Sequence, residues 1–76
     1  MTLHIKDIKK DQVFFERFSD GTMHEFKATA APIHEVKSVG EQWSITGTNT
    51  EGNEIRFLVT QGMEHYGPRL YNTAKG

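Results

Sequence analysis

The chain has 76 residues, no cysteine, and nine basic against ten acidic side chains, which give a formal net charge of −1. A chain of this length forms one domain, residues 1–76, that buries only about 60% of its unfolded surface. The missing cysteines exclude disulfides and thiolate metal sites. The balanced, interspersed charge lacks the basic excess of a general nucleic-acid binder, and the sequence shows neither a long apolar run nor a signal-peptide pattern. We therefore expect a cytoplasmic protein.

Residues 42–60 carry the clearest β-hairpin pattern in the sequence. Apolar and polar residues alternate on both sides of Asn49-Thr50-Glu51-Gly52, which indicates two strands with one buried face each. A type I turn with Gly52 at positive φ closes a three-residue loop. The register that follows pairs Trp43 with Val59, Ile45 with Phe57, and Gly47 with Ile55. Trp43, Ile45, Phe57 and Val59 then face inward together.

Residues 13–28 predict a second hairpin. Asp20-Gly21 between two β-rich runs is typical of a two-residue loop, and this loop places Phe15 opposite Phe26 on the inner face. Glu16 then lies opposite Glu25. The outer face carries three apolar residues that need a cover, which are Phe14, Phe18 and Met23. Exposed apolar surface marks interaction sites, so we expect these three to form a partner interface, unless a terminus of the same chain covers them.

Shorter elements complete the expected fold. We expect a first strand over residues 3–5, a bend at Pro32 because proline cannot donate to a strand ladder, and a strand that resumes over 33–36. A helical turn over 61–68, a last short strand over 69–71 and a frayed tail over 72–76 follow. This order predicts an all-β, SH3-like antiparallel barrel of about five to six strands with one short helical turn before the last strand. The alternative is an open, twisted antiparallel sheet that dimerises.

Residue types suited to chemistry gather only near the C-terminus. His65, Tyr66, Arg69 and Tyr71 surround Gly67-Pro68. Aromatic rings stack on bases and arginine pairs with phosphate or carboxylate, so this cluster is the candidate ligand site; in the simpler alternative, these side chains only plug and rim the barrel end. The four histidines match no familiar metal-site spacing, and neither a nucleophile motif nor a glycine-rich phosphate loop is present. We therefore expect no enzymatic activity, no metal and no cofactor.

The stretches DIKKDQVFFE, WSITGTNTEGNEIRFLVT and EHYGPRLY resemble small uncharacterised β proteins encoded by bacteriophages, and the likeness covers most of the chain. It transfers no functional residue. It implies a bacterial host, in which such accessory proteins block a host protein, sequester a nucleotide signal or mimic nucleic acid; the near-neutral charge argues against mimicry. Our first interpretation is a non-catalytic binding module, such as a counter-defence inhibitor, that binds a host protein or itself. A small-ligand or nucleotide binder and a nucleic-acid-binding barrel are the alternatives.

Overall fold

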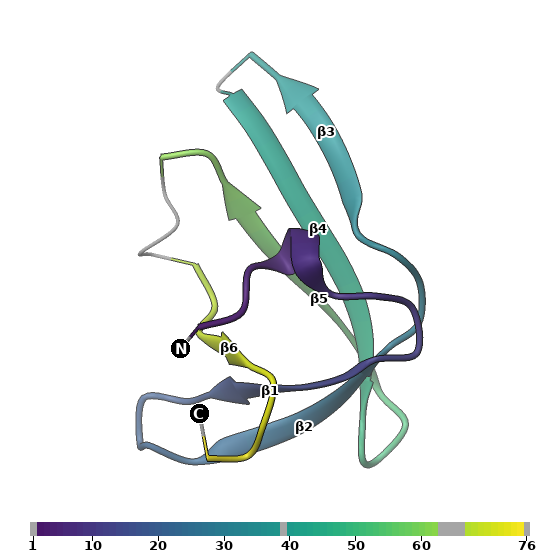
Figure 1. The fold of residues 1–76 in the computed structure, drawn as a ribbon, viewed down its shortest axis with the longest axis vertical. Coiled ribbons are helices and arrows are strands. Elements are labelled where there is room, and N and C mark those ends of the chain that lie inside the picture. The colour runs from purple at the N-terminus through teal and green to yellow at the C-terminus, as the bar shows by residue number, and fades with distance from the viewer. Residues whose placement is uncertain (1, 39, 63–66, 76) are drawn as a thin grey trace.

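The computed structural model describes residues 2–38, 40–62 and 67–75, and these residues form an all-β fold. One short 3₁₀ helix precedes six strands: η1 (Ile5–Asp7), β1 (Val13–Arg17), β2 (Met23–Ala28), β3 (Ile33–Lys37), β4 (Gly40–Asn49), β5 (Glu54–Thr60) and β6 (Leu70–Tyr71). Figure 1 shows β3, β5 and the upper part of β4 rising above a lower body in which β1 and β2 cross beneath β6. The prediction of a small all-β protein is confirmed.

The long strand β4 organises the sheet. Along one edge it pairs with β5, and along the other it pairs first with β3, over residues 40–44, and then with β2, over residues 47–49. The sheet runs in the order β3-β4-β2-β1-β6, with β5 on the opposite edge of β4, and every pairing is antiparallel. Among the described strands β5 and β6 do not pair. In the part of the chain that the structure describes, the antiparallel sheet is a curled half-barrel.

The central hairpin of β4 and β5 has the predicted register. Ile45 lies opposite Phe57 and Trp43 opposite Val59. In the turn, Gly52 adopts a φ of 85° and the Asn49 N–H donates to the Asn53 carbonyl at 3.0 Å. The Asn49 side chain also accepts hydrogen bonds from two backbone N–H groups of the loop, which stabilises the turn locally.

The predicted register of the first hairpin is wrong by one residue. The Phe18 N–H donates to the Thr22 carbonyl at 2.9 Å, and the Gly21 N–H donates back to the Phe18 carbonyl at 2.9 Å. The loop thus has three residues, with Gly21 at a φ of 87°. A one-residue slip moves every side chain to the other face, so Phe14 rather than Phe15 lies opposite Phe26.

This register places Phe14 at the centre of the core, with 0% of its surface exposed. Its ring centroid lies 5.7 Å from that of Phe26 and 5.5 Å from that of Phe57, and the rings of Phe26 and Phe57 meet edge to face at 5.0 Å. A Cβ on Gly47 would come within 3.0 Å of the Phe14 ring, so any other residue here would require the ring or the strand to shift. The remaining buried members of the core are Ile5, Ile8, Ala28, Ile45, Val59 and Leu70.

The N-terminal segment covers the concave face of the sheet without forming the strand predicted over residues 3–5. It turns as η1, capped by His4, whose Nδ1 accepts a hydrogen bond from the Lys6 N–H at 3.1 Å. Ile5 and Ile8 on either side of this turn are buried, which explains why a helical turn is favoured over an extended strand. The predicted helical turn over 61–68 lies partly outside the described residues, whereas the break at Pro32 and the last short strand are confirmed.

The new register makes a direct prediction about the two adjacent phenylalanines. Phe14→Ala removes a fully buried ring and should lower the free energy of unfolding by about 3–5 kcal/mol, which is comparable with the whole stability expected for a chain of this size. Phe15→Ala removes a half-buried ring on the other face and should cost clearly less. Urea denaturation followed by Trp43 fluorescence measures both. If Phe15→Ala proves the more damaging substitution, the observed register is wrong.

Candidate functional site

The structure describes two of the four residues of the predicted ligand cluster, Tyr71 and Arg69. His65 and Tyr66 lie outside the described residues. Tyr71 is 8% exposed, and the guanidinium of Arg17 lies over its ring at 4.9 Å from the centroid. This ring face is therefore occupied by a cation of the same chain. Arg69 is exposed and lines two hollows, of about 340 and 450 Å³, so it is the one described member of the cluster that is placed to meet a ligand.

The predicted partner interface does not form one surface. Phe14 is in the core, which rules it out as an exposed contact. Phe18 is exposed and stacks on His24, with the ring centroids 3.8 Å apart. Met23 pairs with Arg17 and lies half-buried on the opposite face of the sheet from Phe14. The slipped register exchanged the inner and outer faces of β1, so Phe14 faces the core, and Val13 and Phe15 lie on the other face.

A small polar cluster surrounds the tip of the first hairpin. Glu16 lies opposite His24 rather than Glu25, and burial raises the pKa of Glu16 while the nearby imidazole partly offsets the rise. The Thr22 hydroxyl donates to the Asp20 carboxylate at 2.6 Å and lies 3.0 Å from His24 Nε2. The hydrogen bond from the Thr22 hydroxyl, and to a lesser extent the one from the Thr22 N–H, lowers the pKa of Asp20. The cluster organises the loop.

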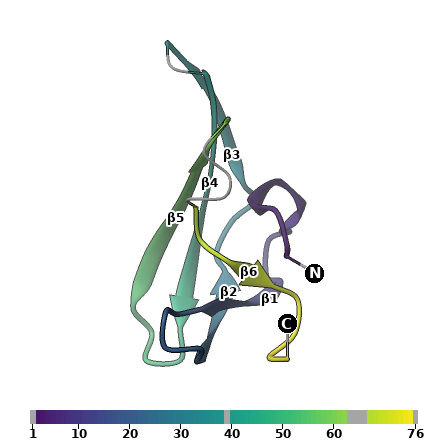
Figure 2. The ribbon, with the colours of Figure 1, turned by 90° about the vertical axis from the view of Figure 1, so that its left-hand side faces the viewer.

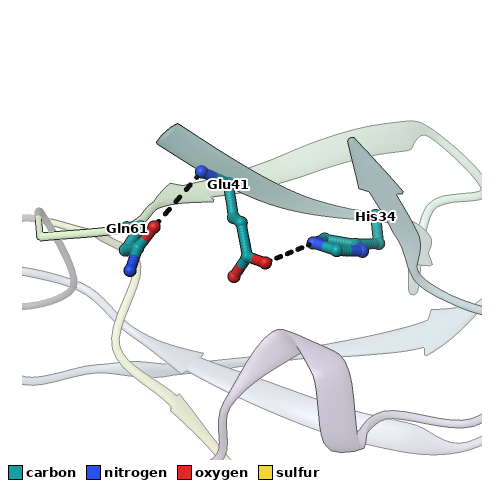
Figure 3. A network of polar contacts seen from close by, with 3 residues as sticks. All are labelled: His34, Glu41 and Gln61. Carbon is teal, nitrogen blue, oxygen red and sulfur yellow. Dashed lines mark hydrogen bonds and ion pairs between the residues drawn. The ribbon is translucent and has the colours of Figure 1, made fainter. Parts of the chain in front are cut away.

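The far end of the sheet carries a second group of polar and aromatic residues on its concave face. The His34 ring stacks on Trp43 with centroids 4.2 Å apart and an interplanar angle of 17°. His34 Nε2 lies 3.5 Å from the Glu41 carboxylate, and the Gln61 side chain accepts a bond from the Glu41 N–H at 3.4 Å. Figure 3 shows Glu41 between the other two side chains, with the turn of η1 below them. A hollow of about 180 Å³ separates this group from His4 and Lys6.

The convex face of the same region exposes two apolar side chains beside charged ones. Ser44 is buried to 2% exposure between Ile33 on β3 and Leu58 on β5, which are its direct cross-strand neighbours. Both neighbours are exposed, Ile33 to 55%. Across them, Arg56 donates to the Ser44 hydroxyl at 3.5 Å and lies 3.8 Å from the Glu35 carboxylate. Both ions are largely exposed, so this pair contributes little to stability.

Edge strand β3 is the most exposed apolar element in the described part of the chain. Val36 is 78% exposed and lies on the concave face, and Ile33 is exposed on the convex face. Figure 2 shows this region in profile as a thin blade standing away from the lower body. Sequence reasoning placed a strand here but missed its exposure, because the pattern Ile-His-Glu-Val has no helical or strict two-residue period that would assign a buried face.

Comparison with protein-family models, with curated proteins and with solved structures finds no match for this chain. Within residues 2–38, 40–62 and 67–75, no three His, Asp or Glu side chains converge as metal ligands would. The same residues include no helix with the length and apolarity needed to cross a membrane. The geometry of the described residues is therefore the basis for a function.

Glu16 supplies a prediction about pH. Its pKa in the folded state is raised above the usual 4.5, so its contribution to stability is present at acid pH and is lost as the pH rises through the folded-state pKa. Glu16→Gln should therefore raise the free energy of unfolding near neutral pH and lose this advantage below the ordinary glutamate pKa. Denaturant titrations in both pH ranges measure the difference, with the exposed Glu25→Gln as control. Equal gains in both ranges, or none near neutral pH, would contradict the assignment.

Proposed function

We propose that this protein is a non-catalytic binding module that acts through the protein surface formed by β3 and its neighbours in the blade. The observation that carries the proposal is the exposure of Val36, at 78%, on a strand whose outer edge pairs with no other described segment. Monomeric proteins rarely leave apolar side chains and a strand edge open together, and such regions mark sites of association.

A protein partner fits this surface better than a small ligand does. The exposed apolar side chains of the blade, Ile33, Val36 and Leu58, stand on two faces and an edge of the sheet rather than around a closed cavity. Small-molecule sites are concave and bury most of the ligand. An extended segment of a partner could instead pair with the β3 edge by main-chain hydrogen bonds and be selected by its side chains.

The resemblance to small bacteriophage proteins supports a host protein as one class of partner, in the cytoplasm of a bacterial cell. Inhibition of a host defence protein is the activity that we propose in that setting. The order of the strands also supports an SH3-like relationship as the finer description of this half-barrel. The proposed inhibition of a host protein and the SH3-like relationship depend on the same feature, which is a small β body from which part of the sheet projects.

A capture experiment tests the binding surface. The tagged wild-type protein should retain one or more specific proteins from a bacterial lysate, and Ile33→Ser/Val36→Ser should lose them, because both apolar contacts disappear. Val13→Ser, which alters a residue 41% exposed on β1, should retain them. Mass spectrometry of the bound fractions reads the result, and circular dichroism confirms that the variants fold. If the double variant retains the same proteins as the wild type, the blade is not the binding surface.

Nucleotide binding is the second candidate, and the hollow of about 450 Å³ favours it because Arg17, Arg69 and the exposed Phe18 all line its wall. An arginine and an aromatic ring are the side chains that hold a phosphate and a base. A nucleotide at a hundred times its Kd should stabilise the fold by about 2.7 kcal/mol, visible as a rise in Tm. Arg69→Ala should abolish the rise and Arg56→Ala should not. No shift with any nucleotide in a panel removes this candidate.

A further inference from the structure

The hydrogen bonds of β4 determine which backbone groups of β3 remain free. On one side, the Gln61 N–H donates to the Glu41 carbonyl at 2.8 Å, so odd-numbered residues of β4 direct their backbone groups toward β5. On the other side, the Thr29 N–H donates to the Thr46 carbonyl at 2.9 Å, so even-numbered residues face β2 and β3. Within an antiparallel pair, bonded and non-bonded positions alternate.

It follows that Ile33, Glu35 and Lys37 bond with β4, since they lie opposite even-numbered residues. His34 and Val36 then direct their N–H and C=O groups away from the sheet. No other strand among the described residues lies on this side of β3. Two residues with exposed apolar or aromatic side chains thus present an unpaired backbone edge, the feature through which strands of different molecules associate.

We infer that the partner for this edge is a second copy of the chain, with the two β3 strands antiparallel and Val36 opposite Val36. The inference rests on the proposed binding surface and names its occupant. Under a two-fold axis normal to the sheet, one residue must lie opposite its own copy. If Val36 lies opposite Val36, these two residues form a hydrogen-bonded pair at the centre of the two strands. Glu35 of each copy then lies opposite Lys37 of the other. Opposite charges directly across a strand pair are favourable.

The other symmetric registers of this edge are unfavourable. Centring on Glu35 would place two carboxylates directly opposite each other, and like charges in this position destabilise a strand pair. Centring on His34 would place Pro32 opposite Val36, and proline has no N–H to donate. Of these three registers, the one centred on Val36 satisfies the charges and the backbone together, and this complementarity of β3 with itself argues for a second copy over an unrelated segment.

The dimer has a defined shape. The two half-sheets join in the order β5-β4-β3-β3-β4-β5, and the two Val36 side chains meet on the concave face that carries Trp43 and His34. The Glu35–Lys37 pairs lie on the convex face. Because β3 spans only Ile33–Lys37, the shared edge is short, and a small interface of this type gives a weak, concentration-dependent dimer.

Cysteine cross-linking tests the register, and the absence of native cysteine makes the experiment clean. In Val36→Cys the two thiols lie opposite each other, within the Cα separation that a disulfide tolerates. Ile33→Cys, also exposed on the same strand at 55%, places its thiols several residues apart. Mild oxidation should cross-link the Val36→Cys protein about tenfold faster than the Ile33→Cys protein, as measured on non-reducing gels. Equal rates overturn the register.

Charge exchange provides an independent test. Glu35→Lys and Lys37→Glu should each sediment as monomers at concentrations where the wild type dimerises, because each creates like-charge pairs. Mixed together, the two variants should dimerise, since every pair is then one cation and one anion; this mixture also controls for the lost contact of Glu35 with Arg56. A wild type that stays monomeric, or a mixture that does not associate, overturns the self-pairing. Neither result bears on the lysate capture, which tests the surface for other partners.

Discussion

The contact between the Phe14 ring and the bare backbone of Gly47 holds the two halves of the molecule together. Gly47 is where β4 begins to pair with β2 after its pairing with β3 has ended. Because a Cβ here would come within 3.0 Å of the ring, the absence of a side chain lets Phe14 reach the strand and meet Phe57. Through this contact the first hairpin packs against the central one.

The curl also explains why a projecting blade exists. The core of a small domain has a limited extent, and here it is centred on the second half of β4. Its first half, residues 40–44, extends past that core with β3 on one side and β5 on the other. Trp43 is only half-buried and stacks on His34 instead of on the main aromatic cluster. The exposed surface is therefore a consequence of one strand being longer than the body that it crosses.

The register predicted from the sequence is correct for the central hairpin and wrong by one residue for the first hairpin, and the reason is physical. In the central hairpin only one loop length puts Trp43 and Ile45 on the same face as Phe57 and Val59, so turn chemistry and hydrophobic pattern agree. In the first hairpin, Val13, Phe14 and Phe15 make both faces apolar, and Asp20-Gly21 suits a two-residue or a three-residue loop. The hydrogen bonds that Asp20 accepts from Thr22 stabilise the longer loop. Because of this error in register, Phe14 was predicted to lie in the partner interface and Glu16 to lie opposite Glu25.

The candidate surface was harder to predict than the strands, because exposure of β3 depends on what lies beside it. A charged edge strand normally resists association, since Lys and Glu on the edge discourage added strands. That protection fails when two copies of a strand pair antiparallel and each positive side chain lies opposite a negative one. Glu35 and Lys37 flank Val36 symmetrically and carry opposite charges, so this edge is complementary to its own copy. The same alternation of charges that discourages other strands thus favours the pairing with a second copy that we infer.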